Sequence, residues 1–227
     1  CAAWLNQQSL WSRGEDQTFD DYLQRFNANQ RRNIKRERKA VAKAGLTVTA
    51  LTGQQLDLEL LRTMHRFYEQ HCARWGPWGS KYLQEGFFEA VANLHRDQLV
   101  LFSAHRGDPR DPVAMSMCVR DTHRLWGRYW GSDEEIDCLH FEVCYYAPIQ
   151  WAIEQGLDHF DPGAGGSHKR RRGFVALPTA SLHRWYHPRM NALIRAWLPK
   201  VNVLMEQEIE AINADLPFKS VAPALAL

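Results

Sequence analysis

The sequence reads R-L-W-G-R-Y-W at 124–130, G-S-D-E-E-I-D-C-L-H-F-E-V-C-Y-Y at 131–146 and L-D-H-F-D at 157–161. The first and last runs are short and rich in aromatic and apolar residues, which favours strands. Asp133–Gln155 has the spacing of a helix, and Gly156 is a natural stop. A strand, a helix and a second strand in this order predict a β-α-β unit with two parallel strands.

Further strands and helices are expected on both sides of this unit. Leu99–His105 and Val113–Arg120 are strand-like runs separated by turn residues, so with 124–130 they predict an antiparallel meander. Another strand is expected from Thr47. Helices are expected at Thr18–Lys43, Leu56–Ala73, Tyr82–Arg96 and Arg189–Ala214. The fold class is therefore α+β, with a central, mostly antiparallel sheet flanked by helices.

Helical spacing also predicts which residues of these helices face the core. In the second helix they are Leu60, Leu61, Met64, Phe67 and Tyr68, and in the third they are Leu83, Phe87, Val91 and Leu94.

Composition narrows the class of protein. The 227 residues carry a net charge of +2, which excludes a generic polycation. Five cysteines, an odd number, argue against a disulfide framework and favour a reducing, cytoplasmic location. No apolar run reaches the roughly 20 residues that span a bilayer. Because the first residue is Cys1, we expect a truncated or processed chain.

Basic character is concentrated in two segments, Arg31–Lys39 and His168–Arg172. The second lies in F-D-P-G-A-G-G-S-H-K-R-R-R-G-F (160–174), where glycines allow positive φ and close approach to a ligand. Lysine, arginine and exposed amides suit phosphate, carboxylate or a developing oxyanion. Solvated basic surfaces are the alternative interpretation of both segments.

A second group of reactive side chains lies in the expected helix at 133–155. His140 and Cys144 share one face at i and i+4, and Glu142 and Tyr146 share another. Acyl transfer to an amine needs a base and a donor for the oxyanion. Glu142 or His140 can serve as base; alternatively, His140 and Cys144 face the core and Glu142 pairs with an arginine.

The runs at 130–146 and 156–174, with P-T-A-S-L-H-R-W from Pro178, resemble the FemAB-like predicted N-acyltransferases of peptidoglycan biosynthesis or recognition. The resemblance implies an acyl-CoA N-acyltransferase-like fold, that of the GCN5-related N-acetyltransferase (GNAT) superfamily. Its expected segments are 1–45 (N-terminal segment and basic helix), 46–187 (acyltransferase domain) and 188–227 (C-terminal helix and tail). The family is similar to the Fem aminoacyltransferases, which transfer amino acids from charged tRNA and have two such domains. The chain therefore resembles the C-terminal portion of a longer protein.

The resemblance and the chemistry together give the candidate site. The expected catalytic residues are Glu142, His168 and Lys169. The expected substrate-binding residues are Arg32, Arg36, Trp130, His140, Tyr145, Tyr146, Gly165, Gly166, Arg171 and Arg172. The chain departs from the family pattern at three positions: Arg171 replaces a lysine, Ser167 a glutamate and Ala147 a glutamine.

The donor is expected to be acyl-CoA or aminoacyl-tRNA, with no tightly bound cofactor. A glycine-rich pyrophosphate loop is missing after 124–130, where Asp133, Glu134 and Glu135 would repel phosphate. The donor's phosphates would then meet the Arg31–Lys39 helix and the Lys169–Arg172 segment.

Three other readings stay open. One is a zinc site, because cysteine and histidine bind zinc and both occur at Cys138, His140, Cys144 and His168. The spacing C-x-H-x3-C, however, lacks the paired ligands of zinc sites. Cys144 can act as a nucleophile with His168. A module without catalysis can use the basic surface to hold an anionic partner, nucleic acid or a lipid-linked precursor. If the chain is instead a transferase, the group that accepts the acyl or aminoacyl moiety is expected to be an amine.

Overall fold

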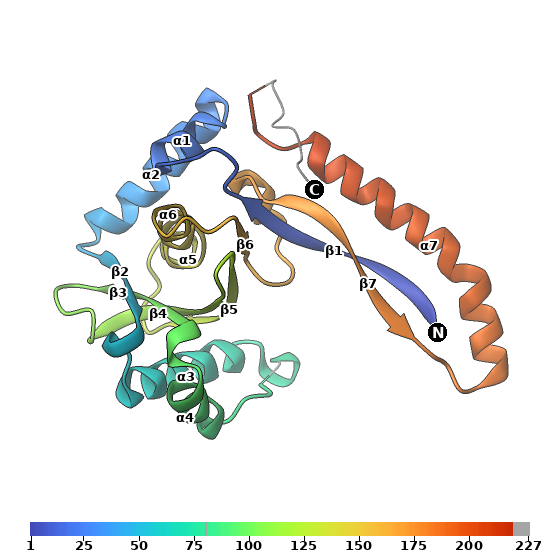
Figure 1. Ribbon diagram of the computed structural model, residues 1–227, viewed down its shortest axis with the longest axis horizontal. Coiled ribbons are helices and arrows are strands. Elements are labelled where there is room, and N and C mark those ends of the chain that lie inside the picture. Colours follow the sequence, from blue (N-terminus) through green and yellow to red (C-terminus); the bar gives the residue numbers. More distant parts are fainter. Residues whose placement is uncertain (80, 220–227) are drawn as a thin grey trace. The chain divides into compact units, whose positions relative to one another are not determined.

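The computed structural model describes residues 1–79 and 81–219 (Figure 1). These residues form two compact units. The larger unit is Ser12–Pro162, and the smaller one combines Cys1–Trp11 with residues 163–219.

The larger unit is built on five strands. They are β2 (Thr47–Thr52), β3 (Leu99–His105), β4 (Pro112–Arg120), β5 (Arg124–Ser132) and β6 (His159–Asp161). Neighbours β2 to β5 pair antiparallel in sequence order, and β6 pairs parallel with β5. The predicted meander and β-α-β unit are both confirmed, as is the α+β class.

Helices cover both faces of this sheet, with α3 and α4 on one and α5 and α6 on the other (Figure 1). The helices of the unit are α1 (Phe19–Gln24), α2 (Ala28–Lys43), α3 (Leu58–Ala73), α4 (Glu85–Leu94), α5 (Leu139–Phe141) and α6 (Ala147–Glu154). A π-helical turn, Glu142–Tyr146, joins α5 to α6. Short 3-10 turns occupy Gly53–Gln55, Gly76–Trp78 and Arg96–Gln98.

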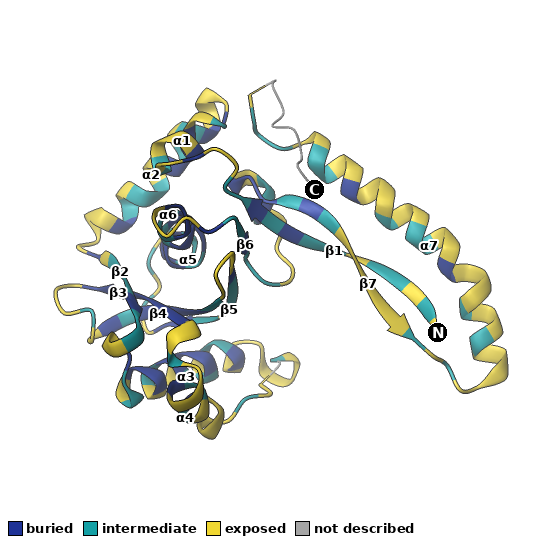
Figure 2. Ribbon diagram, in the orientation of Figure 1, coloured by how far each residue is buried: buried dark blue, intermediate teal, exposed yellow. Residues whose placement is uncertain are grey.

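The predicted core face of α3 is confirmed, because all five of its expected residues are buried (Figure 2). The prediction for the next helix is wrong in part. Phe87 is 38% exposed and Leu94 is 75% exposed, while Phe88 is fully buried. The rings of Phe87 and Phe88 contact each other edge to face, and it is Phe88 that packs against Tyr68 of α3.

The helix predicted at Thr18–Lys43 is two helices. Thr18 caps α1 as expected, in a capping box with Asp21. The chain then breaks, and Asn27 starts α2 by accepting a hydrogen bond from the Gln30 amide at 3.0 Å. A second N-cap inside a helical pattern marks such a break.

The helix predicted from Asp133 begins six residues later, at Leu139. Cys138 precedes it with φ at +64°, a left-handed conformation that a helix interior does not contain. Before it, the Ser132 hydroxyl accepts a hydrogen bond from the Glu134 amide and turns the chain.

The smaller unit contains two long strands that the sequence analysis missed, β1 (Ala2–Ser12) and β7 (Val175–His183). They pair antiparallel from Ala2 opposite His183 to Leu10 opposite Val175. The predicted final helix is confirmed as α7 (Pro188–Ala214). Its Asn202 side chain bridges to the β1 backbone, and the Asn213 amide bonds both backbone groups of Ala176.

Candidate functional site

The glycine-rich basic segment lies in the smaller unit, where Ser167–Arg172 forms a 3-10 turn. Gly165 and Gly166 both have positive φ, as the sequence predicts. Lys169 is only 3% exposed, and its ammonium group donates to the carbonyls of Gly163 at 2.6 Å and Ala164 at 3.1 Å. Lys169 therefore holds the glycine turn in place, whatever chemistry it also serves.

The other basic side chains of this segment differ in exposure. Arg172 is buried and donates to the His168 carbonyl at 2.9 Å, and Arg170 forms an ion pair with Asp215 at 2.7 Å. Arg171 alone is classed as exposed. Burial, with help from the nearby Arg172 and Lys169, lowers the pKa of the His168 imidazole. A neutral imidazole can accept a proton.

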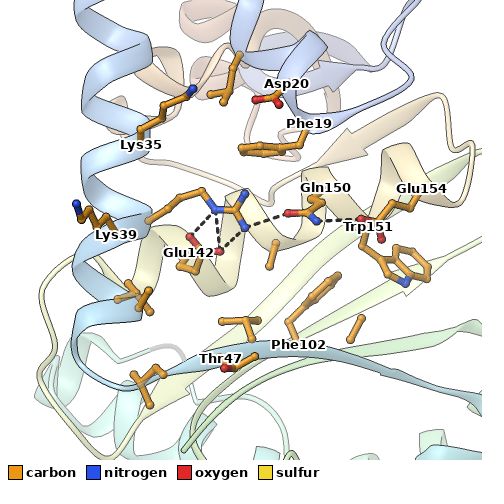
Figure 3. A pocket seen from close by; sticks show the side chains of 18 residues that line it. Phe19, Asp20, Lys35, Lys39, Thr47, Phe102, Glu142, Gln150, Trp151 and Glu154 are labelled. Carbon is orange, nitrogen blue, oxygen red and sulfur yellow. Dashed lines mark hydrogen bonds and ion pairs between the residues drawn. The ribbon is translucent and has the colours of Figure 1, made fainter.

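Glu142 lies in the π-helical turn of the larger unit and contacts α2. The Arg38 guanidinium donates to both its carboxylate oxygens, at 2.9 and 3.1 Å, and to Gln150 Oε1 at 3.0 Å (Figure 3). The Tyr146 hydroxyl bonds Glu37, the neighbour of Arg38. The alternative that Glu142 pairs with an arginine is thus observed, and a role for it as base requires release from Arg38.

A pocket of about 610 Å³, here called the α2 pocket, opens beside this ion pair (Figure 3). Its walls come from α1, α2, β2, β3 and α6. Lys35, Arg38 and Lys39 line it, at the i, i+3 and i+4 spacing of one helix face. Arg32 and Arg36, which the sequence analysis selected on the same helix, are exposed and do not line it.

A second pocket, of about 450 Å³ and here called the β5 pocket, lies at the junction after β5. Trp130 and His140 line it, with ring centroids 4.6 Å apart. The ring centroid of Tyr145 lies 5.3 Å from that of His140. The structure therefore brings together these three residues of the predicted substrate-binding set.

The three acidic residues at this junction are balanced by arginines. Asp133 pairs with Arg66 at 2.8 Å and Glu134 pairs with Arg106 at 2.7 Å. Glu135 lies 4.0 Å from Arg74. Because arginines lie beside these carboxylates, the junction repels phosphate less than three unpaired negative charges would, and the predicted repulsion is overestimated.

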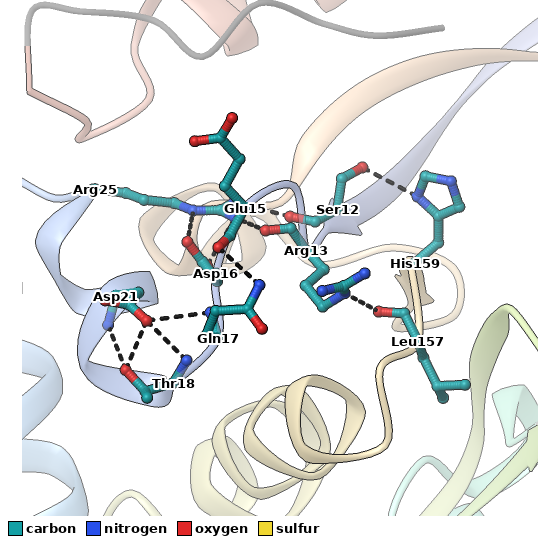
Figure 4. Close-up of polar contacts among 10 residues, drawn as sticks. All are labelled: Ser12, Arg13, Glu15, Asp16, Gln17, Thr18, Asp21, Arg25, Leu157 and His159. Atoms are coloured by element: carbon teal, nitrogen blue, oxygen red, sulfur yellow. Dashed lines mark hydrogen bonds and ion pairs between the residues drawn. The ribbon is translucent and has the colours of Figure 1, made fainter.

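A third polar cluster joins the start of the larger unit to β6 (Figure 4). The Ser12 hydroxyl lies 3.1 Å from Nδ1 of His159, and Arg13 donates to the carbonyl of Leu157 at 3.2 Å. Asp16 accepts from Arg25 at 3.0 Å. Burial outweighs Arg25 and raises the pKa of Asp16. These contacts fix the entry to α1 and the position of β6.

Within residues 1–79 and 81–219, no group of three or more His, Cys, Asp or Glu side chains is arranged to hold a metal ion. In the same part of the chain, no helix is long and apolar enough to cross a membrane.

A family model described as FemAB-like, peptidoglycan biosynthesis/recognition, matches residues 1–220. The chain belongs to the FemAB-like family. No curated protein matches it. The membership confirms the resemblance drawn from the motifs at 130–146, 156–174 and after Pro178.

Solved structures similar to this FemAB-like chain include the structure of L-PGS from Bacillus licheniformis, with 11% identity and a TM-score of 0.52 over 86% of this chain and 67% of that one. The crystal structure of FemX matches with 14% identity and a TM-score of 0.52, over 84% and 58% of the two chains. A conserved protein of unknown function from Bacteroides thetaiotaomicron VPI-5482 matches with 12% identity and a TM-score of 0.50, over 80% and 62%. At identities of 11% to 14%, these structural matches show a shared fold alone. The FemAB-like chain spans 58% to 67% of the length of these proteins.

Proposed function

We propose that this FemAB-like chain has an acyltransferase fold of the GNAT type and transfers an acyl or aminoacyl group to an amine acceptor. The acceptor is a cell-wall precursor or a peptide, and the donor is acyl-CoA or aminoacyl-tRNA, both of which are available in the cytoplasm. One observation carries the proposal: β5 continues well beyond its parallel partner and leads to the β5 pocket.

The parallel pairing covers only Arg124–Trp126 of β5, opposite His159–Asp161. β5 itself continues through Ser132, so Gly127–Ser132 extend past the pair. On its other side β5 stays paired with β4 as far as Ser132. An open strand edge offers backbone donors and acceptors to an extended, amide-containing chain. The arm of an acyl donor can lie there with its reactive carbonyl at the β5 pocket.

Amide formation at this pocket needs one proton acceptor. The amine nitrogen attacks the donor carbonyl, the C–S or C–O bond to the carrier breaks, and the proton lost by the amine passes through a base to the leaving group. His140 lines the β5 pocket, whereas both oxygens of Glu142 accept from Arg38. We therefore assign proton removal to His140 before Glu142.

The other predicted groups lie in the smaller unit, which is a compact unit by itself. Lys169 and the amides of the glycine turn are the proposed oxyanion donors, and His168 is a further proposed base. Lys169 already donates to two carbonyls, so at least two of the three donors of its ammonium group serve the turn. The same segment offers Arg171 on its surface for phosphate groups of the donor.

The test is an amide-forming assay with the purified chain. Acyl-CoA and aminoacyl-tRNA are offered separately with a panel of amines, and the product is measured by mass spectrometry. His140→Ala should lower kcat by about 100-fold or more, the usual contribution of a general base. His95→Ala, an exposed position at the end of α4, is the matched control. Equal loss in both variants, or amide formation with neither donor, would contradict the proposal.

A binding module without catalysis is the second candidate, because Glu142 and Lys169 are both engaged by other protein groups. In that case the basic segment holds an anionic partner. Lys169→Ala separates the two candidates: loss of turnover with binding retained supports the enzyme, and loss of binding alone supports the module. Because Lys169 also holds the glycine turn, the unfolding midpoint of the variant must show that it is still folded under the assay conditions.

A further inference from the structure

The α2 pocket has a cationic wall whose donors are largely uncommitted. Lys35 and Lys39 are exposed, and neither forms an ion pair with the part of the chain that the structure describes. Arg38 uses Nε and Nη2 for Glu142 and Gln150, and its Nη1 makes no hydrogen bond to the described residues. Two ammonium groups and one guanidinium nitrogen therefore remain for a ligand.

The opposite side of the pocket is apolar. Val48 and Ala50 of β2, Phe102 of β3 and Trp151 of α6 line it. The Arg38 guanidinium also lies over the Phe19 ring, 4.4 Å from its centroid, which fixes the plane of the cation. A volume of about 610 Å³ is in the range of small-molecule sites.

The charges of the pocket are segregated. Its three cations all project from α2, while Asp20 belongs to α1, Glu142 is neutralised by Arg38, and Glu154 accepts from Gln150 at 2.9 Å. The formal charges cancel over the whole pocket. The α2 wall alone is positive, so an anionic group is favoured there, and an apolar group is favoured on the sheet side.

We propose that the α2 pocket binds a phosphomonoester attached to an apolar body. The phosphate contacts Lys35, Lys39 and Nη1 of Arg38, because compact ammonium charges and a guanidinium edge both match phosphate oxygens. The body lies on Trp151 and on Val48 and Ala50 of β2, which are partly exposed. An aromatic body would indicate a nucleotide-like ligand, and an aliphatic body would indicate a lipid-like one.

Isothermal titration calorimetry on the whole chain tests this, independently of any transfer activity. The probes are phenyl phosphate and n-octyl phosphate, with inorganic phosphate and phenol as controls. At least one ester should bind about tenfold more tightly than either control, since both halves of the ligand are needed, and the tighter ester identifies the body. Equal affinity for inorganic phosphate and both esters, or absence of saturable binding, would overturn the inference.

Substitutions locate the site. Lys35→Ala and Lys39→Ala should each weaken binding about tenfold, the usual effect of losing a charge-assisted hydrogen bond. Lys43→Ala, an exposed lysine of α2 outside the pocket, should leave the affinity within about twofold. Ala42→Trp adds bulk at the pocket wall without removing charge and should abolish binding altogether. If Lys43→Ala weakens binding as much as Lys35→Ala, the ligand is held elsewhere.

Discussion

Gly131→Ala is expected to destabilise the larger unit by about 3 kcal/mol, the upper end of the range for overpacking a core. Gly131 is buried in β5, against α3. A Cβ atom at this position would lie 2.3 Å from the Phe67 carbonyl oxygen and 2.6 Å from its carbonyl carbon. Ordinary contacts begin at 3.4 Å, so β5 and α3 would have to separate by about 1 Å. The obstructing atoms are backbone, which cannot rotate away.

Urea unfolding measures this difference through the midpoint at constant m-value. A loss of about 3 kcal/mol corresponds to a fall in Tm of about 6–12 °C for a chain of this size. The matched control is Gly86→Ala in α4, an exposed glycine where an added Cβ meets nothing within 4 Å. It should stabilise the protein by about 0.5–1 kcal/mol because alanine favours helix. The reasoning is refuted if Gly131→Ala unfolds within about 0.5 kcal/mol of the parent.

Three further outcomes are expected. Arg38→Ala should cost about 2–3 kcal/mol in urea unfolding, because it strands the buried Glu142 carboxylate, and Arg38→Met with Glu142→Gln should recover most of that loss. Burial lowers the pKa of His168 in the folded protein, so the unfolded chain binds a proton at this imidazole more tightly. The contribution of neutral His168 to stability is therefore present above about pH 6.5 and is lost as the pH falls towards the lowered pKa. Urea midpoints at pH 7.5 and 5.5 measure this loss. Burial raises the pKa of the Cys118 thiol to about 12, so a thiol reagent should modify this residue only after denaturant is added.

Local patterns were sufficient for much of the larger unit. The meander, the β-α-β unit and the buried face of α3 follow from short-range periodicity, which is a direct consequence of the geometry of strands and helices. The break between α1 and α2 was also visible in principle. Asn27 stands where a cap is needed, although the apolar spacing runs through it.

Pairing across the whole chain was beyond such patterns. β1 and β7 are separated by more than 160 residues. Neither strand has clear alternation of buried and exposed residues; in β1, for example, only Ser9 and Trp11 are buried. A strand whose partner is distant in sequence gives no local turn signal. Pro178 inside β7 argued further against a strand, because proline donates no ladder hydrogen bond.

The candidate site shows the same division between local and tertiary information. Spacing placed Glu142 and Tyr146 on one helix face, and both do contact α2, through Arg38 and Glu37. What spacing could not identify is the partner residue on α2: Arg32 and Arg36 were selected from the run of basic residues, whereas Arg38 makes the contact with Glu142. The pairing also changes the meaning of the helix. By engaging Glu142, Arg38 fixes α2 against the π-helical turn, and Lys35 and Lys39 are thereby held at one pocket wall instead of being spread over a solvated surface. The basic helix is therefore organised by one buried carboxylate, and loss of that carboxylate should impair phosphate binding at the α2 pocket even though Glu142 itself would repel phosphate.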